Sequence, residues 1–442
     1  MAILSDFAKT NKYNVQKTTV GFLPRTVTIP LSQEDNFVCE CIVRPGDFVK
    51  EGQVIAEVSR ELYGTKSFGA SKIHSPIPGK VLRIKSCTYP NGKQGKAVEI
   101  LLNGTFSHIG KIQTPFEWSN YSPAMLLRTI SECGVVNTFS NTECQSLELD
   151  ISKVRDEKNK KLFVRLFDED PACQTDSILT NSDFEKILIG ILITAKVCDA
   201  EEIIIAHSIE NDIQNSLTAE QKDLTGHIPV TFIKVDTKFY PAGRKRELIN
   251  AYIKQKKDTE SCSQLKKSCI FTDSNTMIHV YNAVVLNIPV EMINVFVTGD
   301  CLQANALLKV CIGTSFDSIA KQCGGFVKRL GRIIVNGQIN GISVNSLDTP
   351  VTKYVKSISF VSEKDSFDRS IGICMRCGRC RIACDSKLSP DMIYANVISG
   401  AAVEQVYIDS ASLCTGCGVC SCVCPSKLPL TQVIKLLQKE RI

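Results

Sequence analysis

The stretch CMRCGRCRIACDSKLSP (residues 374–390) is followed by a second stretch of matching pattern, CTGCGVCSCVCPSKLPL (residues 414–430). Each has the spacing C-x2-C-x2-C-x3-C, so together they form a repeat that places eight cysteines at equivalent positions. Thiolates at steps of three residues can wrap a loop around one corner of a cubic iron–sulfur cluster. The two runs therefore predict a C-terminal unit built around two [4Fe–4S] clusters.

The fourth cysteine of each run is set apart from the first three. In ferredoxins with two clusters, this cysteine ligates the cluster of the other run. By that pattern, each cluster takes three ligands from one run and one from the other. The first expected set is Cys374, Cys377, Cys380 and Cys424, and the second is Cys414, Cys417, Cys420 and Cys384. Cys422 falls between ligands, and we expect it to be a spare thiol.

Zinc and disulfide bonds are the alternatives for so many cysteines. Structural zinc prefers two C-x2-C pairs separated by a longer loop, which would leave the third cysteine of each run without a role. Disulfides need an oxidising compartment, and residues 1–16 contain no apolar core of a secretory signal. We therefore expect iron–sulfur clusters in a reducing compartment, the cytoplasm.

The two cysteine loops differ in charge. The first carries Arg376, Arg379 and Arg381, whereas the second has no charged residue between its first and last cysteine. Local charge and hydrogen bonds to sulfur tune the reduction potential of a cluster. We therefore expect the cluster anchored by Cys374 to have the higher potential.

The composition of the chain bounds its class. Its 442 residues are 43% apolar and 22% charged, which indicates a globular protein of roughly three or four domains. The net charge of +6 is mild and the basic residues are scattered, which argues against a nucleic-acid partner. The longest apolar stretches, such as residues 187–198, are shorter than the roughly 18 residues that a membrane span needs. We expect no direct membrane span.

Four units follow from the order of strand and helix signals. Residues 1–115 hold short β-prone runs broken by glycine, proline and asparagine, which is typical of a small all-β domain. Residues 116–290 alternate apolar strands with helical segments, which predicts a Rossmann-like parallel α/β domain. Residues 291–362 mix strands with a helix in a small α+β module, and residues 363–442 hold the cysteine runs in a ferredoxin-like domain.

In this order, the segments resemble the C subunit of the Rnf ion-translocating electron transport complex. The likeness is carried by the two cysteine runs, by VTGDCLQANALLKVCIGTSFDSI (residues 297–319) and by TPVTKYVKSISF (residues 349–360). The cobalamin reductase of propanediol utilisation and the flavin-carrying NADH subunit of respiratory complex I are similar. The resemblance implies a barrel-sandwich hybrid-like N-terminal domain, an α/β domain for FMN and NADH, a β-grasp-like (SLBB) module and a dicluster domain. It also implies attachment to the cytoplasmic face of the inner membrane through partner subunits.

The chain departs from that family where the flavin would bind. The family's loop of the form G-x-G-G-A-G-F-P-T corresponds to ECGVVNTFSNTECQ (residues 132–145), in which one glycine remains. Glycines there let backbone N–H groups approach a phosphate that any Cβ would obstruct. The family's N-G-A-E-C-E-P has become RLFDEDP (residues 165–171), and YPAGRKRELI (residues 240–249) carries a basic trio where small or acidic residues are expected. NGQING (residues 336–341) replaces a G-G-P-M-M-G turn.

The loss of these glycines removes much of the physical basis for binding FMN and NADH. Whether the chain binds either cofactor is therefore left open by the sequence. The positions that would surround such a degenerate site are Gly134, Asp168, Glu169 and Gly243. The basic trio, Arg244 to Arg246, could hold a phosphate, but we expect it instead to be a solvated helix start or a partner-facing patch.

Three functional hypotheses remain. The first is an electron-transfer subunit of an Rnf-type complex, which passes electrons through two clusters between NADH, ferredoxin or flavodoxin and the membrane subunits. With an intact flavin site, it would be an oxidoreductase of the NADH:ferredoxin type. The second is a non-catalytic relay and docking subunit that has lost FMN and NADH, for which the arginine-bearing first loop suits an acidic carrier. The third is a cobalamin reductase-like flavoprotein, for which the sequence offers no corrin site. We expect the chain to belong to an Rnf-type complex, as the first hypothesis states. The second hypothesis remains the alternative for how the chain works within that complex.

Overall fold

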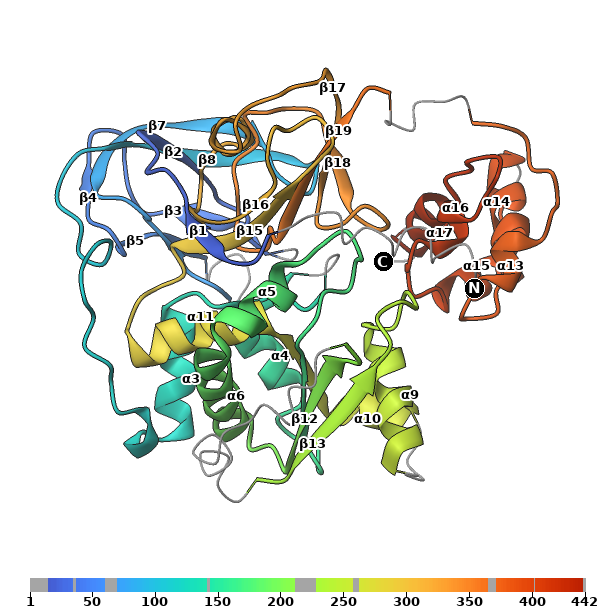
Figure 1. Cartoon of the computed structure of the whole chain (residues 1–442), viewed down its shortest axis with the longest axis horizontal. Coiled ribbons are helices and arrows are strands. Elements are labelled where there is room, and N and C mark those ends of the chain that lie inside the picture. The colour runs from blue at the N-terminus through green and yellow to red at the C-terminus, as the bar shows by residue number, and fades with distance from the viewer. Residues whose placement is uncertain are drawn as a thin grey trace.

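The computed structural model describes residues 15–34, 37–59, 70–140, 144–210, 228–256, 262–364, 371–400 and 402–439. Two β-rich units lie side by side along one edge of the molecule, an α/β unit lies beneath them, and a group of short helices stands to one side (Figure 1). Among the described residues, no helix combines the length and apolar character needed to cross a bilayer.

The N-terminal unit is built from two small antiparallel sheets. The first has the order β2–β8–β7–β4 and the second β3–β5–β6. Their bounds are β2 (Thr26–Pro30), β3 (Cys39–Cys41), β4 (Phe48–Val49), β5 (Val54–Val58), β6 (Ile73–His74), β7 (Gly79–Thr88) and β8 (Gln94–Leu102). Val27 and Ile29 of β2 are fully buried, whereas Thr28 between them is half-buried, as alternation along a strand with one buried face requires. The sheets thus close over a shared apolar interior.

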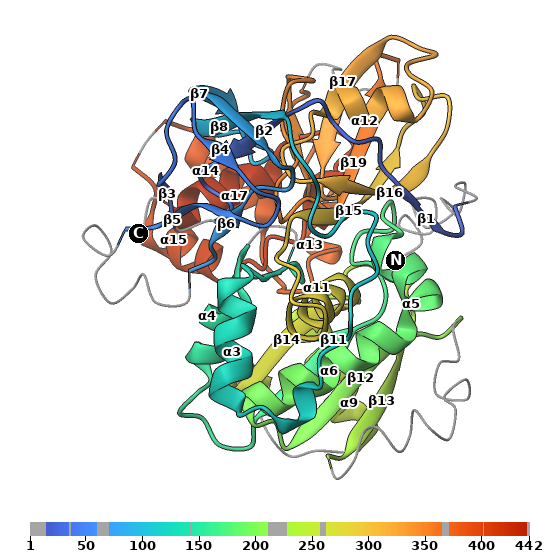
Figure 2. The same cartoon turned by 90° about the vertical axis from the view of Figure 1, so that its left-hand side faces the viewer.

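The β1 strand (Thr18–Val20) leaves this unit and joins a different sheet. It pairs in parallel with β16, so that the six-stranded sheet of the third unit has the order β1–β16–β15–β19–β17–β18 (Figure 2). The elements of the third unit are β15 (Met292–Thr298), β16 (Ala306–Cys311), α12 (Phe316–Gln322), β17 (Leu330–Val335), β18 (Ile342–Val344) and β19 (Ser357–Ser362). A strand from the predicted first unit, β1, therefore belongs to the sheet of the predicted third unit.

The α/β unit holds a parallel sheet of order β13–β12–β11–β14, formed by β11 (Lys161–Arg165), β12 (Glu202–Ser208), β13 (Val230–Val235) and β14 (Cys269–Asp273). Chain order runs outward from β11 to β13 and then returns to place β14 on the other side of β11. The carboxyl ends of β11 and β14 are thus a topological switch point, where open α/β sheets place their ligands.

Helices cover both faces of this sheet. On one face, α6 (Phe184–Cys198) packs against α3 (Pro123–Glu132), α5 (Thr175–Ser182) and α11 (Ser274–Val285); on the other lie α9 (Lys245–Lys256) and α10 (Cys262–Ser268) (Figure 1). The α6 helix is apolar on nearly all sides because it is buried between the sheet and α11. The hairpin β9 (Val136–Asn137) and β10 (Gln145–Ser146) leads into α4 (Leu147–Lys153), and a single 3₁₀ turn spans Trp118–Asn120.

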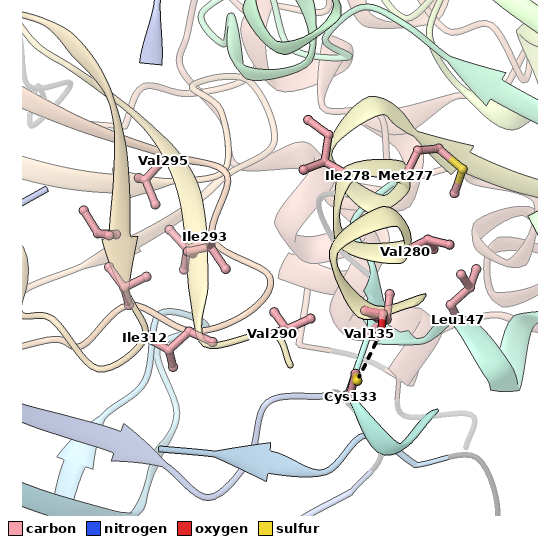
Figure 3. Close-up of a cluster of buried hydrophobic side chains, with 14 of the residues drawn as sticks. Cys133, Val135, Leu147, Met277, Ile278, Val280, Val290, Ile293, Val295 and Ile312 are labelled. Atoms are coloured by element: carbon pink, nitrogen blue, oxygen red, sulfur yellow. Dashed lines mark hydrogen bonds between the residues drawn. The ribbon is translucent and has the colours of Figure 1, made fainter. Parts of the chain in front are cut away.

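One apolar core joins the first three units. Met277, Ile278 and Val280 of α11 lie on one side of this core, and Ile293 and Val295 of β15 on the other (Figure 3). The core reaches the barrel-like N-terminal sheets through Ile312 and its neighbours. A second cluster, centred on Phe163 and Phe271, fills the opposite face of the parallel sheet beneath α9. The α/β unit is therefore fixed against the two β-rich units.

The C-terminal unit is a repeat of two helix pairs with one extra helix. Its elements are α13 (Arg379–Ile382), α14 (Pro390–Ile398), α15 (Gln405–Ser412), α16 (Val419–Cys422) and α17 (Leu430–Lys439). Gly378 and Gly418 begin α13 and α16 with positive φ angles of 74° and 87°, a conformation that favours glycine. The two cysteine runs thus follow the same backbone path.

Candidate functional site

The eight cysteines of the two runs line two separate cavities. Each cavity takes three cysteines from one run and one from the other, and the two cavities enclose about 330 and 350 Å³, their open mouths included. The first is lined by Cys374, Cys377, Cys380 and Cys424, and the second by Cys384, Cys414, Cys417 and Cys420. The structure therefore brings together the same two sets that the spacing predicts. Cys422, which the structure also describes, lines neither cavity.

The local environment of the sulfur atoms suits thiolates bound to metal. Burial raises the pKa of Cys420 to about 12, so this thiol stays protonated unless a bound cation supplies positive charge beside it. The backbone N–H of Leu388 donates to Cys384 Sγ at 3.4 Å, and that of Gly416 donates to Cys414 Sγ at 3.3 Å. Hydrogen bonds of this kind adjust the potential of an iron–sulfur cluster. Four thiolates in each cavity fit a [4Fe–4S] cluster, although four thiolates also suit structural zinc.

The α/β unit holds the loop of the second cavity. The Tyr240 hydroxyl donates to the Cys417 carbonyl at 2.6 Å, and Arg244 Nη1 donates to the Thr415 carbonyl at 2.6 Å. On the adjoining helix, Arg246 forms an ion pair with Asp385 at 3.4 Å. Arg244 and Arg246 therefore contact the chain's own C-terminal unit, a role that neither a solvated helix start nor a patch for a partner protein describes. The spacing of the sequence gives no sign of these contacts.

The switch point of the parallel sheet is filled by the side chain of Arg165, which ends β11. This side chain is 0% exposed, and its guanidinium lies 4.2 Å from the centre of the Phe139 ring. It donates to three backbone carbonyls, at 2.9 Å to Phe139, 3.0 Å to Phe167 and 2.8 Å to Gly243. Arg165 therefore ties three loops together where a ligand of an α/β sheet would enter.

A buried ion cluster closes the β14 side of the same crevice. Lys356, from the third unit, forms ion pairs with Asp176 and Asp273. Burial raises the pKa of Asp176 to about 7. Burial also opposes the charged form of Asp273, but Lys356, aided by Arg165, outweighs it and holds the pKa of Asp273 at about 2. The charge of Lys356 is thus matched by carboxyl groups of the protein itself.

Two backbone N–H groups of the degenerate loop, those of Thr138 and Phe139, already have partners within the protein. The N–H of Thr138 donates to Thr276 Oγ1 at 3.0 Å, and that of Phe139 donates to Asn137 Oδ1 at 3.1 Å. A phosphate-binding loop needs such groups free to point at the anion. The side chain of Thr138 in turn donates to Asp273 at 2.9 Å. Asn141 of this loop lies outside the described residues.

The two glycines named for this site are packed against protein. Gly134 has a φ of +68°, and a Cβ there would meet Lys353 Nζ and the Lys72 carbonyl. A Cβ at Gly243 would lie 3.2 Å from the Phe167 ring and 3.3 Å from Arg165 Cδ. The atoms that crowd both positions therefore belong to this chain itself.

The two acidic residues named for the site also have internal partners. Asp168 accepts from the N–H groups of Asp176 and Ser177, both at 3.0 Å, at the start of α5. Glu169 forms ion pairs with Arg165 at 3.6 Å and with Arg244 at 2.8 Å. Taken with the occupied loop and the buried ion cluster, the residues present at this crevice do not fit FMN or NADH.

Two family models match parts of the chain. The RnfC barrel sandwich hybrid domain matches residues 7–105, and the Nuo51 FMN-binding domain matches residues 147–282. The predicted N-terminal barrel-sandwich and the α/β domain related to the complex I flavin subunit are thus confirmed. The second match begins after the degenerate loop of residues 132–145.

Curated relatives are similar over most of the chain. The C subunit of the proton-translocating ferredoxin:NAD(+) oxidoreductase complex of Clostridium ljungdahlii is 27% identical over 385 residues, which cover 86% of this chain and 81% of the relative. The C subunit of the Na(+)-translocating ferredoxin:NAD(+) oxidoreductase complex of Acetobacterium woodii is 23% identical over 381 residues, or 86% and 83% of the two chains. The predicted resemblance to the C subunit of the Rnf complex is therefore confirmed.

Among solved structures, an NAD+-reducing [NiFe]-hydrogenase in the air-oxidised state aligns with a TM-score of 0.48 and 11% identity. The alignment covers 71% of this chain, and the chain spans 60% of the hydrogenase chain.

Proposed function

We propose that this RnfC-like chain is an electron-relay subunit of an Rnf-type membrane redox complex. It passes electrons between a soluble carrier protein and the membrane subunits of that complex. The observation that carries the proposal is the pair of cavities, each lined by four cysteines drawn from both runs. The chain attaches peripherally to the cytoplasmic face of the inner membrane through those subunits.

When bound, the two [4Fe–4S] clusters would each store and pass on one electron. The residues of the chain hold them, shield them and fix their separation. The cross-run sets of cysteines tie both cavities into one rigid unit, because neither set is complete without the other run. Leu428 and Leu430 are buried at the wall of the first cavity and make that side of it apolar. Arg244 and Tyr240 fix the loop of the second cavity against the α/β unit.

The relay form of the hypothesis is favoured over a flavin enzyme by the closed crevice. Arg165 and Lys356 occupy the switch point of the sheet with bonds inside the protein. A flavin phosphate would have to displace these bonds and leave buried charges unpaired, which is costly. We therefore propose a subunit whose electron donor and acceptor are other proteins, and assign it no NADH-dependent activity.

Elemental and cofactor analysis of anaerobically purified protein tests both parts of the proposal. We expect about eight irons and about eight sulfides per chain, EPR signals of reduced [4Fe–4S] clusters, and no flavin even after incubation with excess FMN. NADH-dependent dye reduction should be absent. Zinc in place of iron would end the relay proposal. One bound FMN per chain, with dye reduction by NADH, would instead overturn the relay form and leave the two clusters standing.

A further inference from the structure

A large groove separates the α/β unit from the C-terminal unit on the side of the second cavity. It encloses about 2640 Å³, its open mouth included, between the ends of β13 and α9 on one wall and α13 and the start of α14 on the other. Of the eight cysteines of the two runs, all of which the structure describes, Cys384 alone lines this groove. The groove therefore leads to the second cavity and not to the first.

Apolar side chains are exposed on both walls. Phe239, which follows β13, is 50% exposed, and Ile382 of α13 is 86% exposed. Beneath them, Val419 and Val423 are buried and complete an apolar floor. Exposed apolar surface rimmed by charge is typical of a protein–protein contact.

Basic residues outnumber acidic ones around this floor. The acidic side chains are three, Asp236, Glu247 and Asp385, and Asp385 is already paired with Arg246. The basic side chains are five, Lys234, Lys254, Arg379, Arg381 and Lys387, and of these Arg381 is paired with Asp391. An excess of positive charge around an apolar floor steers a negatively charged protein into contact.

We propose that this groove docks a small acidic protein that carries one electron at a time, and that the chain exchanges electrons with it beside Cys384. The inference rests on the proposed function and names its partner and its point of entry. In each transfer, the carrier loses one electron and the chain gains that electron. No proton and no third reactant are required.

A charge-reversal experiment on the full chain with its clusters tests the groove. The probe is a purified acidic bacterial ferredoxin with two [4Fe–4S] clusters, and its affinity is measured by calorimetry at several salt concentrations. Lys254→Glu and Lys387→Glu together change one exposed residue on each wall. We expect the Kd to rise about tenfold or more and its dependence on salt to weaken. Phe239→Ala should also raise the Kd while leaving the salt dependence intact.

The matched control reverses two exposed lysines of the N-terminal unit, Lys93→Glu and Lys111→Glu. This variant has the same net charge and should bind as the unaltered protein does. If both variants bind the ferredoxin equally weakly, only the overall charge matters, and the proposal that the groove is the docking site would be overturned. A rise in Kd of the same size from Arg376→Glu, an exposed change beside the first cavity, would overturn it as well. Neither result would touch the relay proposal, which depends on iron and sulfide content.

Discussion

Replacing Arg165 by methionine tests whether the crevice is closed by the protein itself. Methionine keeps much of the length of the arginine stem but removes three donors, so three buried carbonyls lose a partner. The variant also loses the ion pair with Glu169 and the stacking on Phe139. Breaking a buried, hydrogen-bonded charge from one side costs about 3–5 kcal/mol. We expect a loss of that order in the stability of the α/β unit.

Hydrogen exchange followed by mass spectrometry suits this prediction, because unfolding of a chain with several units is not a two-state process. A loss of about 3–5 kcal/mol should speed exchange in peptides that cover β11 and α5 by about 10²- to 4 × 10³-fold. The matched control is Arg329→Met, whose side chain is 83% exposed and forms a 3.3 Å ion pair with Glu363. Such surface pairs contribute about 0–1 kcal/mol, so exchange there should change little.

Two results would refute the reasoning about Arg165. Exchange around β11 that is unchanged in Arg165→Met would mean that its three carbonyl bonds do not hold the crevice. Protection of β11 by added FMN in the unaltered protein, absent from the variant, would mean that Arg165 is a flavin ligand and that the crevice opens.

Three further predictions concern the cavities, one glycine and one buried acid. Cys384→Ala should lose the iron of the second cavity, about half the total, whereas Cys422→Ala should keep its full iron content. If Cys384→Ala instead loses the EPR signal of the cluster in the first cavity, the cross-run sets of cysteines are wrong. Gly134→Ala should destabilise the protein by about 1–3 kcal/mol, because its positive φ and contact with Lys353 exclude a Cβ, and an unchanged melting temperature would contradict this. Because the pKa of Asp176 is raised to about 7, the folded state binds an extra proton between about pH 4 and pH 7, so stability should fall as pH rises through that window. Asp176→Asn should flatten this fall in melting curves recorded from pH 5 to pH 8.

The sequence could predict features that depend on residues close together in the chain. Cysteine spacing predicts which thiols meet, since the equivalent turns at Gly378 and Gly418 are set within each run. The alternation of strands and helices likewise predicts the parallel sheet. Contacts between distant segments leave no such pattern. Lys356 reaches Asp176 from another unit, and Arg165 bonds the Gly243 carbonyl from the far side of the crevice. The closure of the crevice was therefore beyond sequence reasoning, although the missing glycines indicated where to look.

The same limitation changes the expected difference between the two cluster potentials. By sequence, the first loop holds three arginines and the second none, which predicts a higher potential at the first cavity. In the folded chain, Arg381 is bonded to Asp391 through both of its carboxylate oxygens, at 2.7 Å each, so its charge is largely balanced. Arg244 meanwhile donates to the Thr415 carbonyl inside the second loop. A cation near a cluster favours its reduced form. The gap between the two potentials should therefore be smaller than the loop sequences imply, and Arg244→Met should widen it by lowering the potential of the second cluster in an EPR redox titration. A rise in that potential, or no change, would refute the view that the charge of Arg244 raises the potential of the second cluster.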